Sequence, residues 1–486
     1  MYSYTDSYLY CTGVSTMTII NIDPADSLPL IHQITNGIKA LIDNRVIRSG
    51  SRMPSIRNFA SDHGVSRFTV VQSYDQLVAM GYLNSRLGSG FYVSARPKPH
   101  TSAEVSKLDD SIDVAWLLRN ALEDRTSKTM PGAWWLPASW MEETGIQKSL
   151  RALALKHGEF FTAYGTPAGY QPLRELLQGK LSNIGVTAET SQIVLTSGVT
   201  HAMDLITRYF VNPGDVVLVD DPGFFILFGG LKSFGAKIVG VPWNHDGPDI
   251  PTMEALIKEH SPRIYFTNTI LHNPTGVSIS QSVAYRMLQL AEKYDMILVE
   301  DDIYGDFHPA KVTRLATLDQ LDRVIYVSSF SKTLSASLRV GYFACKKELA
   351  ASLCDMKLLT GLTTSEVGER IILQVLASGH YRKHMDKLRL RLQEARTSTI
   401  ARLEKLGFTT YLEPEGGMFI WVKLNDEANL TALAAQASKQ GVMLAPGNVF
   451  RPHQEPSPWL RFNVAHCENE ATFEILSKIV GTHEND

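Results

Sequence analysis

Short apolar runs alternate with helical patterns through the middle of the chain. The runs are Ile193–Leu195, Val216–Val219, Arg263–Phe266, Met296–Val299 and Arg323–Val327. Such alternation of strands with helices is typical of a mostly parallel sheet that is covered by helices. The sequence therefore predicts an α/β fold for the larger part of the chain.

The domain organisation follows from length and from local composition. With 486 residues, the chain is long enough for about three domains of roughly 150 residues. Residues 1–24 are polar, so we expect a disordered extension, in which translation starts at Met1 or at Met17. Residues 96–115 contain Pro97, Pro99 and polar side chains, a composition typical of a linker. The linker separates an N-terminal domain, 25–95, from a larger domain, 116–486.

Composition argues against several classes of protein. Hydrophobic residues make up 44% of the chain and charged residues 20%, as in an ordinary soluble globular protein. The four cysteines form no C-x-x-C pair, so we expect no metal site and a reducing compartment. No apolar run approaches the roughly 18 residues of a membrane helix. The first basic residue is Lys39, which argues against a signal peptide. We therefore expect a cytoplasmic protein that does not bind membranes.

The N-terminal domain has the pattern of three helices followed by a hairpin. The expected elements are helices over 30–42, 55–62 and 67–80, strands over 81–83 and 91–93, and a turn over 87–90. Ser55 and Ser66 are suitable N-caps for the second and third helices. The inward face of the third helix is expected to consist of Val70, Val71, Tyr74 and Leu77. This order of elements predicts a winged helix-turn-helix.

Charge supports DNA as the partner of this domain. The whole chain has a net charge of −3, but the segment from Asp26 to Ala95 contains seven basic and four acidic residues. A locally basic segment is expected of a nucleic-acid-binding domain. The expected DNA contacts are Arg57, Ser66, Arg67, Thr69, Gly88 and Ser89. The alternatives are a small helical dimerisation domain and, for Arg57 and Arg67, a solvated helix face.

Residues 28–93 resemble the GntR-type winged helix. The resemblance is carried by Met53-Pro54-Ser55, Gly64-Val65-Ser66-Arg67, Thr69-Val70, Gly81-Tyr82-Leu83 and Gly88-Ser89-Gly90. It implies that the domain binds promoter DNA.

A lysine near residue 330 has the setting of a pyridoxal 5'-phosphate (PLP) site. Lys332 lies in Ser329-Phe330-Ser331-Lys332-Thr333, and Arg339 follows seven positions later. The lysine would form an imine with the cofactor, while Ser329 and Arg339 would hold its phosphate. Asp301 follows an apolar strand and could keep the pyridine nitrogen protonated. The alternative interpretation is that Asp301 belongs to an acidic loop without a role in cofactor binding.

Other candidate cofactor residues also follow predicted strands. The stretch Ser197-Gly198-Val199-Thr200 opens a helix and could bind an anion, although it could also be an ordinary cap. Phe224 could lie on the pyridine ring or belong to the core. Asn273 and Tyr304 could bond the phenolate oxygen, and the alternative for Asn273 is a turn. The order of these motifs favours one shared site.

From Trp116 to Ile479 the chain resembles fold-type I PLP enzymes of the aspartate aminotransferase family. The resemblance rests on the motifs above and on Tyr164-Gly165-Thr166-Pro167-Ala168-Gly169, Gly416-Gly417-Met418-Phe419 and Trp459-Leu460-Arg461-Phe462-Asn463. It implies a large domain and a smaller C-terminal α+β subdomain, mainly 350–486. It also implies that Arg461 binds the α-carboxylate of an amino compound. Tyr164 would reach the phosphate in the neighbouring subunit of a homodimer.

A GntR-type winged helix fused to such a domain resembles the MocR-type bacterial regulators. Val199-Thr200 and Phe224 depart from the usual residues of this pattern, but the required backbone and ring face are kept. The resemblance implies a PLP-dependent transcriptional regulator that senses PLP or an amino compound. One alternative is a working aminotransferase with an accessory DNA-binding domain. The other is an architectural DNA-binding protein with an empty cofactor fold.

Overall fold

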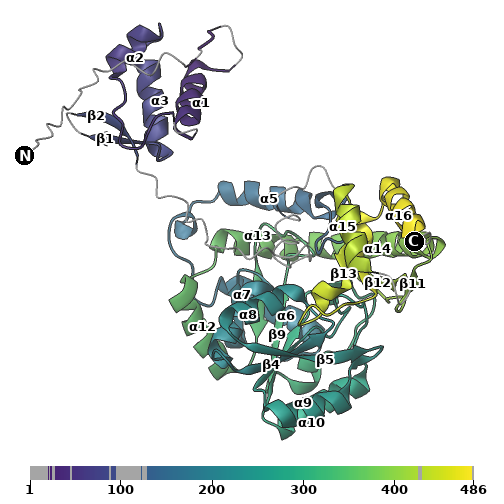
Figure 1. Cartoon of the computed structure of the whole chain (residues 1–486). Helices are drawn as coiled ribbons and strands as arrows, with labels where there is room; N and C mark the ends of the chain where they lie inside the picture. Colours follow the sequence, from purple (N-terminus) through teal and green to yellow (C-terminus); the bar gives the residue numbers. More distant parts are fainter. Residues whose placement is uncertain are drawn as a thin grey trace, which may run out of the picture. The chain divides into compact units, whose positions relative to one another are not determined.

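A computed structural model describes residues 20, 22–24, 28–43, 46–86, 89–94, 122, 129–424 and 429–483 (Figure 1). The chain divides into two compact units, Met1–Asp109 and Asp110–Asp486, and each is described by itself. Of the expected extension over 1–24, only residues 20 and 22–24 are among those described. The expected linker, 96–115, lies outside the described residues.

The first unit is a winged helix. It consists of α1 (Leu30–Asp43), α2 (Ile56–Asp62), α3 (Arg67–Ala79), β1 (Leu83–Arg86) and β2 (Gly90–Val93). The strands pair antiparallel, with Leu83 opposite Val93. Both predicted N-caps are confirmed, because the Ser55 hydroxyl accepts from the Asn58 amide and the Ser66 hydroxyl from the Thr69 amide. These caps fix where the second and third helices begin.

Two details of the predicted winged helix were wrong. The first strand begins at Leu83, because Gly81 has a left-handed φ of 74° and the amides of Gly81 and Tyr82 bond back to the end of α3. Gly81 and Tyr82 therefore terminate the helix. On α3, Val71 is only partly buried and Ser73 is fully buried in its place. The Ser73 hydroxyl donates to the carbonyl of Thr69, which satisfies a polar group inside the core.

The second unit is built on an eight-stranded sheet with the order β3-β10-β9-β8-β7-β4-β5-β6. Its strands are β3 (Ile193–Thr196), β4 (Val216–Asp221), β5 (Lys237–Asn244), β6 (Gly247–Pro248), β7 (Ile264–Thr267), β8 (Ile297–Asp301), β9 (Val324–Ser329) and β10 (Gly341–Ala344). The pairs from β5 through β4, β7 and β8 to β9 are parallel. The five predicted runs are β3, β4, β7, β8 and β9, so the predicted α/β fold is confirmed.

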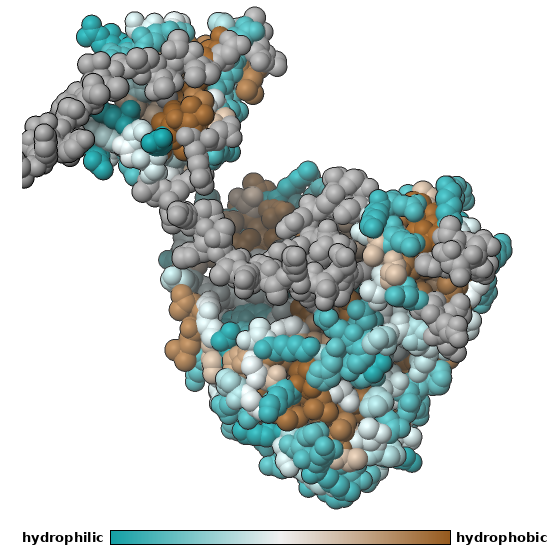
Figure 2. Space-filling model, in the orientation of Figure 1, coloured by the Kyte–Doolittle hydropathy of each residue, from teal (hydrophilic) through white to brown (hydrophobic). Residues whose placement is uncertain are grey.

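Most residues of the central strands are buried because helices cover both faces of this sheet. The helices of this part of the chain are α5 (Glu143–Ala154), which packs on α13, and α6 (Gln171–Asn183), α7 (Val199–Phe210), α8 (Phe225–Phe234), α9 (Ile250–His260), α10 (Gln281–Lys293), α11 (Leu315–Asp319), α12 (Lys347–Gly361) and α13 (Glu366–Ala377). Helices α9 and α10 lie side by side (Figure 1). On the face drawn in Figure 2, apolar side chains lie in small groups between hydrophilic ones. The buried strand residues belong to one hydrophobic core cluster.

A smaller four-stranded antiparallel sheet follows, with the order β11-β12-β14-β13. Its elements are β11 (Thr409–Thr410), β12 (Phe419–Lys423), β13 (Ala445–Pro446), β14 (Trp459–Asn463), α14 (His380–Lys405), α15 (Leu430–Lys439) and α16 (Glu470–His483). Its apolar residues join the same core cluster as the large sheet. Among the described residues, no helix is both long and apolar enough to cross a membrane.

Candidate functional site

A cavity lies at the carboxyl ends of the parallel strands. It is lined by Trp134, Val199, Thr200, Phe224, Ile226, Asn268, Asn273, Asp301, Ile303, Tyr304, Ser329, Ser331, Lys332 and Arg339. Parallel strands bring the loops that follow them to one edge of a sheet, which is where α/β folds bind ligands. The fold therefore brings together most of the residues that the sequence suggested for a cofactor.

Lys332 and Asp301 face this cavity from neighbouring strands. Lys332 follows β9 and donates from Nζ to the Trp134 carbonyl at 2.7 Å. Burial, followed by the positive charge of Arg461, lowers the pKa of Lys332 to about 7. Asp301 ends β8, and burial raises its pKa to about 7. A lysine with this pKa is a neutral nucleophile for much of the time at neutral pH.

An anion-binding corner forms where α7 begins. Its N-cap, Gly198, has a φ of 84°, and a Cβ there would lie 2.7 Å from Nη2 of Arg339. Nη2 donates to the Ser197 carbonyl at 2.9 Å, and Nη1 to the Ser331 hydroxyl at 3.4 Å. The Ser329 hydroxyl accepts from the Ser331 amide. A helix N-terminus beside an arginine and hydroxyl groups suits a phosphate.

Asn273 and Tyr304 meet on another wall of the cavity. Nδ2 of Asn273 donates to the Tyr304 hydroxyl at 3.4 Å. Burial raises the pKa of Tyr304 well above its ordinary value, so the phenol keeps its proton. Both side chains can therefore donate to a phenolate oxygen. Phe224, the N-cap of α8, also lines the cavity.

Arg461 lies beside Asn273 and is fully buried. It donates from Nη1 to Oδ1 of Asn273 at 2.9 Å and from Nη2 to the Gly132 carbonyl at 2.6 Å. Its guanidinium also lies over the rings of Phe419 and Phe450. Nε has no partner among the described residues. Burial lowers the pKa of Arg461 to about 9.

Five residues that line the cavity were missed by the sequence analysis: Trp134, Asn268, Ser331 and the apolar Ile226 and Ile303. Asn268 follows β7 and joins the site by bonding the Asp301 carbonyl and the Asn273 amide, at 2.7 and 2.8 Å. The rule that selected Asn273, a polar residue after a strand, would also have selected Asn268. Ser331 could have been selected because it is next to Lys332. Trp134 lies far from the strand pattern, and nothing local in the sequence marks it.

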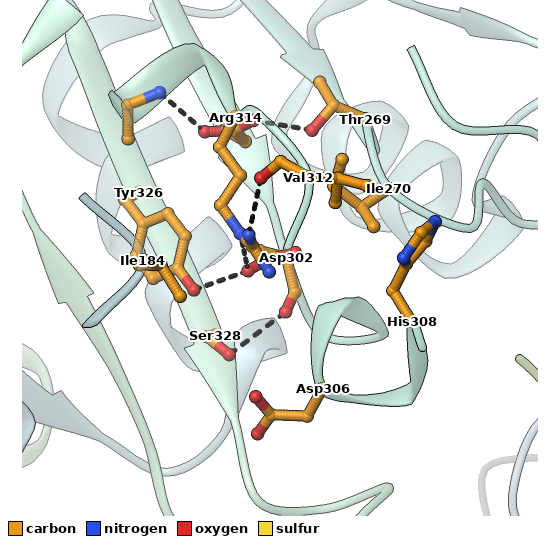
Figure 3. A network of polar contacts seen from close by, with 12 residues as sticks. Ile184, Thr269, Ile270, Asp302, Asp306, His308, Val312, Arg314, Tyr326 and Ser328 are labelled. Atoms are coloured by element: carbon orange, nitrogen blue, oxygen red, sulfur yellow. Dashed lines mark hydrogen bonds and ion pairs between the residues drawn. The ribbon is translucent and has the colours of Figure 1, made fainter. Parts of the chain in front are cut away.

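A buried network of ionic and polar contacts holds Glu300 and Asp302, the residues on either side of Asp301 in the sequence. Arg314 donates from Nε to Asp302 at 2.6 Å, and the Tyr326 hydroxyl donates to the same oxygen at 2.6 Å. Figure 3 shows both side chains pointing at Asp302. The neighbouring Glu300 accepts from the Thr269 hydroxyl and from the first amides of α11. Residues on both sides of Asp301 are therefore fixed by polar contacts.

Tyr164 is not part of the cavity within its own chain. Its side chain is 80% exposed. A hydrogen bond from the Thr166 hydroxyl to the Gly169 carbonyl stabilises the loop that follows it. The predicted role of Tyr164 involves a second subunit and stays a prediction.

The predicted DNA contacts lie on the helix-turn-helix and the wing. Arg57 is in the first turn of α2 and Arg67 opens α3; both are exposed and form no ion pair within the described residues. Ser66 and Thr69 share a hydrogen bond of 2.7 Å between their hydroxyls. Ser89, on the wing, bonds the Tyr92 hydroxyl. Gly88 lies outside the described residues.

Comparison with known proteins identifies both parts of the chain. It belongs to the family "Aminotransferase class I and II", whose model matches residues 139–479. Residues 30–93 match the bacterial regulatory proteins of the gntR family. The predicted winged helix fused to an aminotransferase-like domain, the MocR-type arrangement, is therefore confirmed, and it supports the interpretation of the chain as a transcriptional regulator.

Individual relatives share either the whole architecture or the larger domain. The chain is 27% identical over 470 residues to the HTH-type transcriptional regulator YdfD of Bacillus subtilis, with 91% of this chain and 94% of YdfD covered. It is 28% identical to aromatic-amino-acid aminotransferase 1 of Thermococcus litoralis, with 67% and 81% covered. The crystal structure of Pyrococcus horikoshii kynurenine aminotransferase matches with 26% identity and a TM-score of 0.70, covering 77% of this chain and 95% of that one.

The cavity has the chemical groups that PLP requires. A corner for phosphate, a carboxylate for the ring nitrogen, donors for the phenolate and a lysine for the aldehyde all line one cavity. A Cβ at residue 198 would displace the guanidinium of Arg339, and the φ of 84° there also favours glycine. With the family match, this donor set confirms the predicted cofactor.

Proposed function

We propose that the protein is a homodimeric regulator that binds promoter DNA through its winged helix and senses PLP or an amino compound in the site around Lys332. PLP, when bound, supplies an aldehyde carbon that exchanges between the lysine and the amino group of a ligand. Because promoter DNA is the target, we place the protein in the cytoplasm.

The observation that carries the proposal is that the buried Arg461 has no acidic partner among the described residues. This cation is fully buried, and its hydrogen-bond partners among the described residues are the neutral oxygens of Asn273 and Gly132. A buried charge without a counter-ion is costly. A ligand carboxylate would supply that counter-ion, and Lys332 would face the amino group of the same ligand. This geometry favours an α-amino acid as the effector.

The exposed position of Tyr164 supports the homodimer. A tyrosine that is 80% exposed on a hydrogen-bonded loop is available to a second subunit. In the proposed dimer, Tyr164 of each chain completes the phosphate corner of the other. Replacement by phenylalanine should then weaken cofactor retention without changing the fold of the chain that carries it.

The test measures operator binding by fluorescence anisotropy while amino acids are titrated. The wild type should change its DNA affinity with an effector that bears an α-carboxylate, whereas Arg461→Ala should keep basal DNA binding and lose the response. Arg323→Ala is the control, because Arg323 precedes β9 at the end opposite the site. Equal responses in wild type and Arg461→Ala would remove Arg461 from sensing.

Transamination is the second candidate function, and the lowered pKa of Lys332 favours it. A neutral lysine amine beside the ligand can accept and return a proton. The experiment is to incubate the protein with each amino acid and to measure pyridoxamine phosphate and keto acid. Turnover at a steady rate would establish an enzymatic activity beside regulation.

A further inference from the structure

We propose that the exposed face of α3 reads A·T base pairs, with Phe68 packed on a thymine methyl group and Gln72 hydrogen-bonded to adenine. The inference rests on the proposed function, because it names the DNA sequence that the winged helix would prefer.

Phe68 is exposed although its side chain is large and apolar. Its side chain is 69% exposed, more than any other large apolar residue in the described part of the winged helix. The core of this unit is closed without it, since Val70, Tyr74 and Leu77 on the same helix are fully buried. A large aromatic side chain left in water next to Arg67 suits a binding surface.

Residues 68, 72 and 75 lie on one face of α3. They are separated by four and three positions, which places them in line along a helix, and all three are exposed. The N-terminal turns of a recognition helix are the part that meets base edges in the major groove. Asp75 lies one turn further along, where its negative charge would be repelled by phosphates. The base-reading part of this face is therefore limited to Phe68 and Gln72.

The other polar groups at this end of α3 have local partners. The Ser66 hydroxyl caps the helix through the Thr69 amide and shares a hydrogen bond with the Thr69 hydroxyl. Arg67 and Gln72 are then the polar side chains with donors available for bases. The amide of a glutamine matches the N6 and N7 atoms of adenine, and thymine carries the methyl group that an apolar side chain contacts.

Charge complementarity supports DNA as the occupant of this face. Arg57 and Arg67 lie in the first turns of α2 and α3, are exposed and form no ion pair within the described residues. Two such arginines attract the phosphates on either side of a groove. Phe68 and Arg67 both lie in the first turn of α3, the end of a recognition helix that meets the bases.

The experiment uses the full-length protein loaded with PLP. Wild type first selects duplexes from a random pool, and each thymine of the selected half-site is then replaced by deoxyuridine, which removes only the methyl group. At one thymine the wild type should lose about fourfold in affinity, the effect of one buried methyl-sized group. Replacing the paired or adjacent adenine by 7-deazaadenine should weaken binding about fivefold or more.

Two variants test which side chain contacts which base. Phe68→Ala should bind thymine and deoxyuridine duplexes equally, and Gln72→Ala should lose sensitivity to 7-deazaadenine. Met80→Ala is the matched control, because Met80 is 55% exposed at the far end of α3 and should leave both sensitivities unchanged. The inference is overturned if wild type binds its selected DNA with no methyl dependence, or if Phe68→Ala keeps it. Failure of wild type to enrich any sequence would instead overturn the proposed function.

Discussion

Arg461 donates a hydrogen bond of 2.9 Å to Asn273, which joins β14 of the small sheet to the loop after β7 of the large sheet. Asn273 also contacts Tyr304, so the residue that would bind a ligand carboxylate is connected to the residues that would bind the cofactor ring. A carboxylate at Arg461 would compete with the oxygen of Asn273. In the proposed function, ligand binding would therefore change a contact between the two sheets and so connect the site to a change of shape.

We expect Lys332→Ala to lose its covalent link to PLP. The variant should lack the yellow absorption of an imine, and borohydride treatment followed by mass spectrometry should find no modified lysine. Lys346→Ala is the control, because Lys346 is exposed and paired with Asp322. A reducible imine in Lys332→Ala would show that another lysine carries the cofactor.

The rate of PLP binding to the apoprotein should rise across about pH 7. Lys332 has its pKa lowered from 10.5 to about 7, so its amine is protonated and unreactive below this pH and neutral above it. The negative charge of Asp301 raises the pKa of Lys332, so Asp301→Asn should move the midpoint to lower pH. Stopped-flow absorbance measures both profiles. A rate that keeps rising towards pH 10 would contradict the lowered pKa.

Many features of this fold could be predicted because local patterns determine them. The serines at residues 55 and 66 fix helix starts, and apolar runs followed by helices predict five strands of the large sheet. Strand β10 was not predicted, because it pairs antiparallel between β3 and β9 and no helix connects it to β9. Strand β5 was not predicted either, because it contains Gly240 and Pro242, which lower strand propensity.

The candidate site was predictable where chemistry follows a strand and unpredictable where distant segments meet. Asp301 ends a strand, and Asn273 and Lys332 follow strands, so the parallel sheet brings the three together. Trp134 contributes a backbone carbonyl, which any residue could supply. Spacing also could not reveal Arg461, which lies 188 positions from Asn273; its role entered only through the family resemblance.

The buried ion pair of Arg314 and Asp302 should contribute strongly to stability. Both side chains are at most 5% exposed, and removal of one partner from a buried pair typically costs about 3–5 kcal/mol. Arg314→Met should lower the urea midpoint accordingly, and the double variant with Asp302→Asn should recover most of the loss. The control Arg323→Met breaks a pair between the partly exposed Arg323 and the exposed Asp295 and should cost at most about 1 kcal/mol. Equal midpoints for the two single variants would contradict this account.

The two arginines of the helix-turn-helix should differ in their effect on DNA binding. Arg67 opens α3, so Arg67→Ala should cost about 1–3 kcal/mol and relax the preference at one base pair. Arg57 is in the preceding helix, so Arg57→Ala should weaken all sequences alike and reduce the salt slope by about one. Anisotropy titrations at several salt concentrations separate the two effects. If both variants bind the operator as tightly as wild type, the winged helix contacts DNA through other residues.

Effector and operator should affect each other by the same factor. A ligand shifts an equilibrium between two shapes only through its different affinity for them, so the coupling must be reciprocal. A typical coupling of about 1–3 kcal/mol corresponds to a shift of roughly 5–150-fold in operator affinity when the effector is bound. The affinity for the effector is measured from the cofactor spectrum with and without a saturating operator duplex. The ratio of these two affinities should equal the ratio of the operator affinities measured with and without the effector. A response of DNA binding to the effector without this reciprocal shift would mean that the effector alters the protein by turnover, and the cofactor would then be found converted to pyridoxamine phosphate.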